Sequence, residues 1–403
     1  MQVTERFLKY VSFDTTSSET SDTVPTTAHQ KELGRYLADE LARLGLENAH
    51  MDQLGYVYAV LPATPGQEHV PALGLISHMD TSPAVSGADI HPQIVTYQGG
   101  DLPLAKTGCL RVKDFPFLSR YVGQQLIVTD GTTLLGADDK AGVAEIVTAC
   151  EYLLAHPEIP HRTVAVCFTP DEEVGKGADH FDPAKFPAKA AYTVDGGELG
   201  EIEYENFNAA AVTLTVHGVN IHPGSAKDKM KNAVLMAHQF ISLLPEAETP
   251  AHTEGYEGFY HVTDVSGNET EVVLHAIIRD HDREKFEARK TFVENAVRYL
   301  NGVWGDGSFQ LELKDSYYNM REKIEPCFYI VERAMKAMEA VGMDARTSPV
   351  RGGTDGARLS YEGLPCPNLC TGGDNYHGRF EYIPVEDMEK CVEMLISLLT
   401  NVE

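Results

Sequence analysis

The stretch PALGLISHMDTSP, residues 71–83, runs from an apolar segment directly into His78 and Asp80. An apolar run without polar alternation, here residues 72–76, is typical of a strand buried on both faces of a parallel sheet. In open α/β sheets, ligands bind at the carboxyl ends of the strands. Residues i and i+2 of an extended chain point to the same side, so Asp80 could hydrogen-bond His78 and orient it as a metal ligand. For the segment His78-Met79-Asp80 taken alone, the alternative is an aspartate in a turn that follows a buried histidine.

Three more predicted strands end in acidic residues. The strand at 125–130 leads to Asp138 and Asp139 at the start of a helix, where capping and the helix dipole are a sufficient alternative explanation. The strand at 164–168 ends in the acidic run 171–173, which an ordinary acidic loop would also explain, and the strand at 190–194 ends in Asp195. Because four apolar strands each end in histidine or acid, the sequence predicts one shared site at the sheet edge.

Composition narrows the functional class. With 403 residues, two domains are expected, and 33 Lys plus Arg against 60 Asp plus Glu argues against a nucleic-acid partner. No apolar run reaches membrane-spanning length and the N-terminus lacks a secretory h-region, so we expect a cytoplasmic protein with no membrane partner. Seven dispersed cysteines fit reduced core thiols better than a disulfide framework.

The middle of the chain changes pattern to a compact β-α-β-β-α-β series. We expect strands at 209–217, 257–264, 271–279 and 307–314, with helices at 228–244 and 282–300. This order is that of a ferredoxin-like α+β domain. The fold class is therefore α/β, with a largely parallel sheet in a catalytic domain (1–207 and 318–403) interrupted by a smaller lid domain (208–317).

The residues at the strand ends have the chemistry of a metal centre. They are His78, Asp80, Asp138, Glu172, Glu173, Asp195 and, near the C-terminus, His377. One bridging carboxylate and two further ligands per ion suffice for two metals. Histidine and carboxylate donors favour zinc, with cobalt or manganese as substitutes. The sequence contains no H-E-x-x-H, G-x-S-x-G or Walker motif, so serine-nucleophile chemistry has no support.

A set of longer motifs resembles the M20 family of metallopeptidases, and within it the tripeptide aminopeptidases. The motifs are HMDTSP, TLLGADDKAGVAEI, FTPDEEVGKGADHFD, YTVDGG, NIHPGSAK, EGYEGFYH, SYYNMRE, RGGTDGA, PCPNL and NYHG, and they run nearly end to end. The resemblance implies a dizinc catalytic domain interrupted by a smaller lid domain. It also implies a cytoplasmic hydrolase of peptide catabolism. Many relatives form a homodimer, so the resemblance implies a homodimer as well.

Roles for individual residues follow from the resemblance. It makes Asp138 the bridging carboxylate, with His78 and Asp195 on one zinc and Glu173 and His377 on the other. Asp80 is then the partner of His78, and Glu172 is the general base. The assignment of Glu172 and Glu173 to these two jobs rests on the resemblance alone, and Asp139 is not expected to be a ligand.

Substrate recognition is assigned to three more residues. His222 resembles the family histidine that approaches the oxyanion of the reacting carbonyl when the lid closes. Arg279 and Arg351 are candidate clamps for a peptide carboxylate, because guanidinium binds carboxylate through two parallel hydrogen bonds; structural ion pairing is the alternative for each. The chain also departs from the family pattern at Asp374, where an aromatic residue can stand, which leaves substrate preference open.

Competing functions remain at this point. A dipeptidase, a carboxypeptidase or an N-acyl amino-acid deacylase could use a similar metal site, so fold alone does not choose among them. A catalytically silent peptide-binding protein is an alternative hypothesis in which the chain is not an enzyme. The complete ligand set and the intact general base argue against a silent protein.

Overall fold

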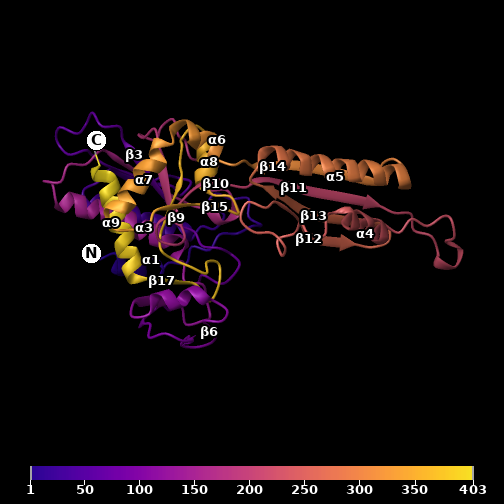
Figure 1. Cartoon of the computed structure of the whole chain (residues 1–403), viewed down its shortest axis with the longest axis horizontal. Coiled ribbons are helices and arrows are strands. Elements are labelled where there is room, and N and C mark those ends of the chain that lie inside the picture. Colours follow the sequence, from indigo (N-terminus) through magenta and orange to yellow (C-terminus); the bar gives the residue numbers. More distant parts are fainter. Residues whose placement is uncertain (1, 402–403) are drawn as a thin grey trace. The chain divides into compact units, whose positions relative to one another are not determined.

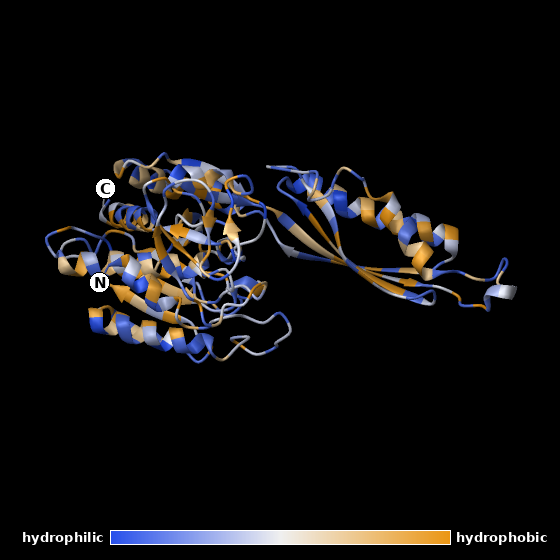
Figure 2. Ribbon diagram, turned by 90° about the horizontal axis from the view of Figure 1, so that it is seen from below, coloured by the Kyte–Doolittle hydropathy of each residue, from blue (hydrophilic) through white to orange (hydrophobic). Residues whose placement is uncertain are grey.

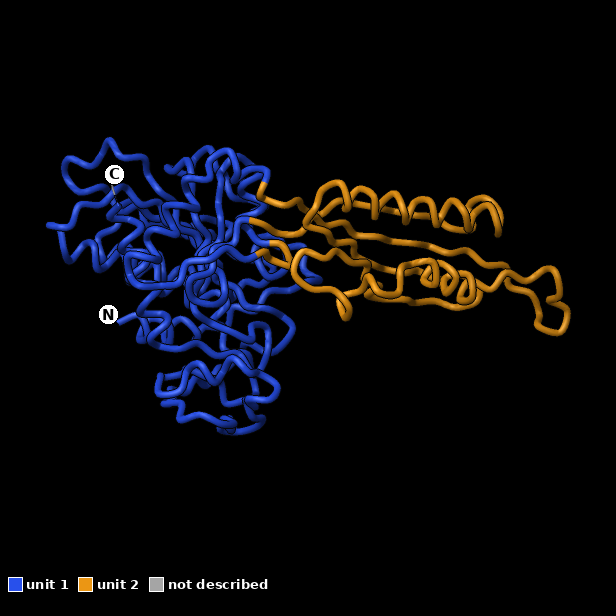
Figure 3. The backbone as a smooth tube through the Cα atoms, in the orientation of Figure 1, with its two compact units in different colours: residues 1–204, 322–348, 354–403 blue, residues 205–321, 349–353 orange. Residues whose placement is uncertain are grey.

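The computed structural model describes residues 2–401, which form two compact units (Figure 3). Unit 1 comprises residues 1–204, 322–348 and 354–403, and unit 2 comprises residues 205–321 and 349–353. The chain therefore leaves unit 1 and returns to it. The domain limits expected from the sequence, 1–207, 208–317 and 318–403, stay a prediction.

Unit 1 is built on an eight-stranded sheet (Figure 1). Its strands, in spatial order, are β1 (Glu47–Met51), β2 (Val57–Leu61), β8 (Val164–Thr169), β3 (Leu73–His78), β9 (Ala191–Gly196), β16 (Asn368–Cys370), β10 (Glu201–Asn206) and β15 (Arg346–Val350). The four central strands β8, β3, β9 and β16 are parallel, whereas β1, β2 and β10 join antiparallel. The parallel centre predicted from the apolar runs at 72–76, 164–168 and 190–194 is confirmed. The predicted strand at 125–130 is wrong as a member of this sheet, because residues 125–128 pair in a separate three-stranded sheet, and β16 is the fourth parallel strand.

Helices cover this sheet. Those outside unit 2 are α1 (Val3–Tyr10), α2 (Gln30–Leu44), α3 (Ala137–Ala155), α6 (Arg321–Ile324), α7 (Tyr329–Ala340), α8 (Asp355–Tyr361) and α9 (Val385–Thr400). Helix α3 packs against β3 and β9 and also against α1 and α9, so it is buried along most of its length. Hydrophobic residues gather on the strands and inward helix faces (Figure 2). Burial of α3 on several sides fixes its N-terminus at the carboxyl edge of the sheet.

The chain between β3 and α3 forms most of a smaller subdomain, which one strand from near the C-terminus completes. It contains the three-stranded sheet β17-β7-β4, formed by β4 (Gln93–Thr96), β7 (Gln125–Val128) and β17 (Tyr382–Pro384), and the hairpin of β5 (Leu102–Pro103) and β6 (Cys109–Leu110). Strand β17 follows the His377 segment, and it pairs antiparallel with β7, which precedes the Asp138 segment. Two segments far apart in sequence are thereby held side by side.

Unit 2 has the ferredoxin-like topology expected from the sequence. Its sheet, in the order β12-β13-β11-β14, is formed by β11 (Asn208–His217), β12 (Phe259–Gly267), β13 (Glu271–Asp280) and β14 (Phe309–Tyr317), and its helices are α4 (Ala233–Leu243) and α5 (Arg283–Trp304). All three strand pairs are antiparallel. Helix α4 begins later than expected because the side chain of Asn232 caps it by accepting the N–H groups of Val234 and Leu235.

Within residues 2–401, no helix combines the length and apolarity needed to span a bilayer.

Candidate metal centre and active site

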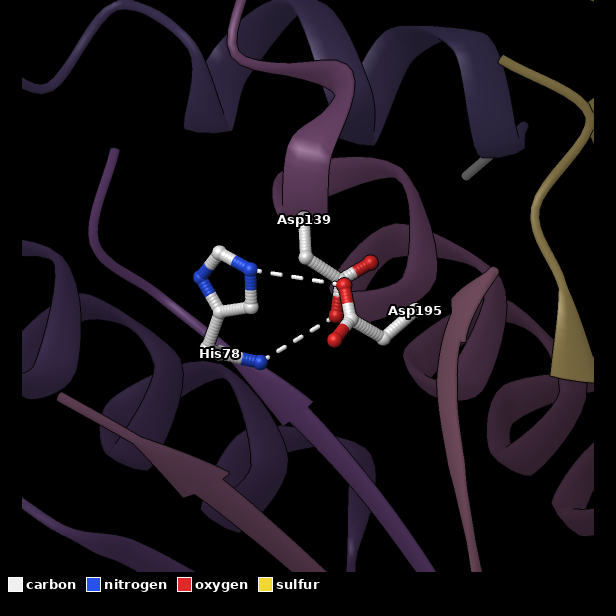
Figure 4. Close-up of side chains that lie close together, drawn as sticks. All are labelled: His78, Asp139 and Asp195. Carbon is white, nitrogen blue, oxygen red and sulfur yellow. Dashed lines mark hydrogen bonds and ion pairs between the residues drawn. The ribbon is translucent and has the colours of Figure 1, made fainter. Parts of the chain in front are cut away.

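Neighbouring strand ends bring the first group of side chains together. Strand β3 ends at His78, and β9 carries Asp195 next to its last residue. Nε2 of His78 lies 3.4 Å from Oδ1 of Asp195, and the backbone N–H of His78 donates to Oδ2 of Asp139 at 3.1 Å (Figure 4). Asp139 comes from the first turn of α3, so the helix start and two strand ends meet at one point.

Asp138 lies between two histidines. Its Oδ1 is 2.8 Å from Nε2 of His78, and its Oδ2 is 3.0 Å from Nε2 of His377. Each carboxylate oxygen thus faces a different imidazole. This is the arrangement that a carboxylate bridging two cations requires, because each oxygen is directed to one half of the site.

His377 also contacts the acidic run after β8. Its Nε2 lies 2.9 Å from Oε2 of Glu173. The ring comes from a loop in which both His377 and Asn375 have positive φ, 60° and 58°, so local turns aim the imidazole back toward the sheet edge. The structure therefore brings together His78, Asp138, Glu173, Asp195 and His377, although they come from five separate segments.

Asp80 makes more contacts than the sequence suggested. Nδ1 of His78 lies 3.1 Å from the backbone carbonyl of Asp80 and 3.3 Å from its Oδ1, as expected from their i and i+2 positions. The same carboxylate accepts the backbone N–H of Glu172 at 3.0 Å and that of Glu173 at 3.2 Å. One completely buried residue therefore orients a histidine, and its side chain also fixes the backbone of both acidic residues.

The ionisation of the site reflects crowded charge. Burial is the main cause that raises the pKa of Glu173 to about 7 and of Asp195 to about 6, and it also raises the pKa of Glu172 well above its ordinary value. Hydrogen bonds to Asp138 and Glu173 raise the pKa of His377 to about 11. In the absence of a cation, protons therefore offset the concentration of negative charge.

The donor set fits divalent metal ions. Two groups of potential ligands have atoms within 4.8 Å of one another, and they are His78 with Asp139 and Asp195, and His78 with Asp138 and Glu173. In addition, Oε1 of Glu173 is buried without a hydrogen-bond partner among residues 2–401. A buried carboxylate oxygen without a donor is costly unless a cation approaches it. Asp139, which was not expected to be a ligand, lies in the first of these groups.

The sequence assigned no role to three buried acids around the site, although it marked Asp171 as part of an acidic run. Asp171 accepts the backbone N–H of Thr26 at 2.8 Å and the amide of Gln30 at 2.7 Å, which anchors the turn that precedes Glu172. Asp355 accepts the hydroxyl of Thr169 at 3.0 Å at the end of β8. Glu381 accepts backbone N–H groups of the segment that carries Asp138. The only available signal for Glu381 was an acid within an otherwise apolar strand-like run.

The other predicted site residues belong to unit 2. His222 is exposed, and its Nδ1 accepts the N–H of Gly224 at 3.1 Å, which places the ring proton on Nε2. It lines a cavity of about 560 Å³ together with Asn220, Ile221, Pro223, Met230, Asn232 and Glu269.

The two candidate arginine clamps already make contacts within unit 2. Nη1 of Arg279 donates to the carbonyl of Ile278 at 3.0 Å, and its guanidinium lies over the ring of Tyr317. Nη1 of Arg351 donates to the carbonyls of Gly255 at 2.7 Å and Glu257 at 2.9 Å. These partners are main-chain carbonyl groups, so this side of the guanidinium is already engaged.

Asp374, the position that departs from the family pattern, has a structural partner. Its Oδ2 accepts the hydroxyl of Tyr382 at 3.0 Å, and its Oδ1 accepts the N–H of Asn375 at 2.7 Å. The backbones of Asp374 and Tyr382 are also paired. The carboxylate therefore supports the loop that carries His377.

Comparison with known proteins extends these observations. The model of the peptidase family M20/M25/M40 matches residues 128–401. A protein named peptidase T from Clostridium novyi is 54% identical over 400 residues, which covers 98% of each chain. The crystal structure of the aminopeptidase PepT from Bacillus cereus superposes with a TM-score of 0.78 at 26% identity, covering 100% of this chain and 98% of that one. A tripeptidase from Staphylococcus aureus has the same fold, with a TM-score of 0.80 at 22% identity over 100% and 98% of the two chains.

Proposed function

Because the chain belongs to peptidase family M20/M25/M40, we propose that it is a dizinc aminopeptidase that removes the N-terminal residue from tripeptides. Peptide hydrolysis follows from family membership and from 54% sequence identity to a protein named peptidase T over 98% of each chain. The observation that carries the proposal is the position of Asp138, whose two oxygens face His78 at 2.8 Å and His377 at 3.0 Å. The length preference for tripeptides is supported by the motifs that resemble tripeptide aminopeptidases.

His78 and Asp195 would hold one zinc, Glu173 and His377 the other, and Asp138 would contact both. Histidine nitrogen and carboxylate oxygen are good zinc donors, and cobalt or manganese could substitute. When bound, the pair would supply Lewis acidity and lower the pKa of water toward neutrality. Asp80 would keep the Nδ1 proton of His78 in place, so that Nε2 presents its lone pair.

Glu172 is proposed as the general base. Its backbone is fixed by Asp80, whereas its side chain is only half buried and remains able to reach a substrate. It would take a proton from the attacking water and deliver it to the leaving amine, which balances the hydrolysis. Burial raises the pKa of Glu172, which makes it a stronger base than an ordinary carboxylate once it is ionised.

Unit 2 would supply substrate recognition. The Nε2–H of His222 is the donor needed to stabilise an oxyanion, and Arg279 and Arg351 are proposed to bind the peptide carboxylate. Arg279 is the first candidate of the two. Arg351 would have to exchange at least one of its carbonyl contacts for that role.

Cellular context forms a separate part of the proposal. Seven free cysteines are consistent with a reducing compartment, so we expect the cytoplasm. A homodimer is also proposed, because exposed apolar side chains on α5, including Tyr299 and Val303, could be buried against a second copy. Analytical ultracentrifugation of the zinc-loaded protein would test the dimer.

The substrate assignment is tested by initial rates on trialanine, dialanine, tetra-alanine and N-acetyl-trialanine, with the products identified. Release of alanine from trialanine alone would establish the requirement for a free amine and the length preference. Preference for dialanine or for the acetylated peptide would instead indicate a dipeptidase or deacylase. No turnover of any peptide before or after chelator treatment would favour a silent binding protein.

A further inference from the structure

Glu381 is a buried acid that the mechanism above does not use. It follows His377 by four residues, it is 1% exposed, and it immediately precedes β17. Its Oε2 accepts the backbone N–H of Leu135 at 2.6 Å and that of Gly136 at 2.9 Å. Its Oε1 accepts the backbone N–H of Asp138 at 3.2 Å. A single carboxylate therefore receives three N–H groups from one turn.

That turn determines where Asp138 lies. Gly136 has φ of 80°, a left-handed conformation that lets successive N–H groups of the turn converge on an anion. Without the carboxylate, three buried or part-buried N–H groups would lose their acceptor, and each would keep the full cost of its removal from water. The conformation that directs the two Asp138 oxygens toward different histidines thus depends on Glu381.

The contact also joins two distant ligand segments. His377 and Glu381 lie on one loop, whereas Asp138 lies on another segment of the chain, 243 residues away from Glu381. Pairing of β17 with β7 brings these segments near each other, and Glu381 links their ends directly. Lys140, whose ammonium is buried and donates to the carbonyl of Phe13 at 2.8 Å, contributes positive charge toward Glu381.

We propose that Glu381 is a positioning residue of the metal centre, which holds Asp138 between His78 and His377 and thereby sets the zinc affinity of the site. The inference rests on the proposed function, because it assumes that Asp138 and His377 hold metal. Glu381 itself is not a ligand in this scheme, since both of its oxygens already accept backbone N–H groups.

The test compares zinc affinity in full-length wild type and Glu381→Gln, measured by competition with a chromogenic chelator on metal-free protein. The amide would place an NH₂ group against one or more N–H donors, so we expect zinc binding to weaken about 10- to 100-fold. Glu381→Ala should show at least the same loss. Circular dichroism would verify that each variant is folded at the temperature of the titration.

A matched control separates positioning from general destabilisation. Glu40 is also a buried carboxylate of unit 1, but it accepts from Nε of Arg6 at 2.9 Å and from the hydroxyl of Tyr10 at 2.8 Å, which lie on α1. Glu40→Gln should lower the melting temperature while leaving zinc affinity unchanged. Equal zinc affinity in wild type and Glu381→Gln, or an equal loss in Glu40→Gln, would overturn the inference.

Failure of the proposed function would be visible separately. A wild-type protein that binds zinc but hydrolyses no peptide would overturn the peptidase proposal, whereas the affinity ratio between wild type and Glu381→Gln would still decide the role of Glu381. A wild-type protein that binds no zinc would overturn both.

Discussion

Oδ1 of Asp80 accepts the backbone N–H of Glu172 at 3.0 Å while it lies 3.3 Å from Nδ1 of His78. The same side chain therefore connects a proposed metal ligand to the proposed general base. A change at Asp80 should affect metal binding and proton transfer together, although Asp80 would touch neither the metal nor the substrate.

Replacing Asp80 by Asn is expected to weaken zinc binding about 10- to 100-fold, because the amide cannot accept from His78 and from both backbone N–H groups at once. The turnover number at saturating zinc should also fall, since the Glu172 backbone loses its anchor. Asp89→Asn is the control, because Asp89 is an exposed aspartate whose partner is His91. Normal zinc affinity and turnover in Asp80→Asn would contradict the dual role.

The two adjacent glutamates should respond differently to the same substitution. Glu172→Gln is expected to retain zinc and to lower the turnover number about 10²- to 10⁴-fold, the usual contribution of a general base. Glu173→Gln is expected to lose one zinc ion per chain, because it removes a ligand oxygen next to His377. Atomic absorption together with peptide hydrolysis would measure both variants. The opposite pattern would mean that the two assignments are reversed.

Removal of metal should make stability depend on pH. Burial raises the pKa of Glu173 from 4.5 to about 7 and of Asp195 from 3.8 to about 6, so the folded state holds protons that the unfolded chain has released. Folding stability therefore falls as pH rises through this window. The hydrogen-bonded His377 acts in the same direction, because its stabilisation is full below 6.5 and is lost as pH rises toward about 11.

Chelator-treated protein is therefore expected to have a lower melting temperature at pH 8 than at pH 5. Zinc-loaded protein should lack this difference, since the cation replaces the protons. Zinc at a thousand times its dissociation constant adds about 4 kcal/mol to the free energy of unfolding. Calorimetry at both pH values, with and without zinc, measures the effect. If the melting temperature of the metal-free protein rose from pH 5 to pH 8, the expected sign would be wrong.

Glu145 should lower the stability of the protein as the pH rises above 4.5. It lies within α3, and both of its carboxylate oxygens are buried without a hydrogen-bond partner among the described residues. Burial raises the pKa of this carboxyl well above 4.5, so the unfolded chain releases its proton first. Relative to Glu145→Gln, the wild-type free energy of unfolding should fall by up to about 1.4 kcal/mol per pH unit above 4.5.

Chemical denaturation of the two proteins between pH 5 and pH 8 would measure that slope. Glu389→Gln provides a matched control, because Glu389 is an exposed glutamate on another helix of unit 1, α9. A constant difference in stability between wild type and Glu145→Gln across this range would show that Glu145 does not hold its proton in the folded state.

Arg279→Lys should raise the Michaelis constant for tripeptides if Arg279 binds the substrate carboxylate, because lysine cannot form two parallel hydrogen bonds. Arg283→Lys is a suitable control, since Arg283 also lies over an aromatic ring, that of Tyr318, and pairs with Glu287. Steady-state kinetics with trialanine would compare the two variants. An unchanged Michaelis constant for Arg279→Lys would remove this role.

Much of the fold could be predicted because its elements are locally encoded. The apolar runs that became β3, β8 and β9 are continuous, and α2 ends at Gly45 in the left-handed conformation expected of a C-cap. The short strands β10 and β16 were not predicted, because neither carries a long apolar run or a clear alternation. Their position depends on pairing with distant strands.

The site also contains residues that could be identified from the sequence and contacts that could not. Side chains directly after apolar strands, such as His78 and Asp195, could be identified from their position in the sequence. The contacts of Asp80 with two backbone N–H groups and of Glu381 with the Asp138 turn could not, because main-chain donors are present at almost every residue. Which donors a buried acid meets depends on tertiary structure, and a single sequence carries no local signal for it.

The position of β16 has a consequence for synthesis of the protein. This strand, residues 368–370, lies between β9 and β10 in the sheet, and His377 follows it. A nascent chain that has released the first 360 residues from the ribosome therefore contains all of unit 2 but an unfinished sheet in unit 1. Since domains generally fold as units during translation, the inserted unit should fold before the one that surrounds it. Enzymatic competence would then appear only after the last tenth of the chain has emerged, which keeps an incomplete peptidase inactive while it is still being made.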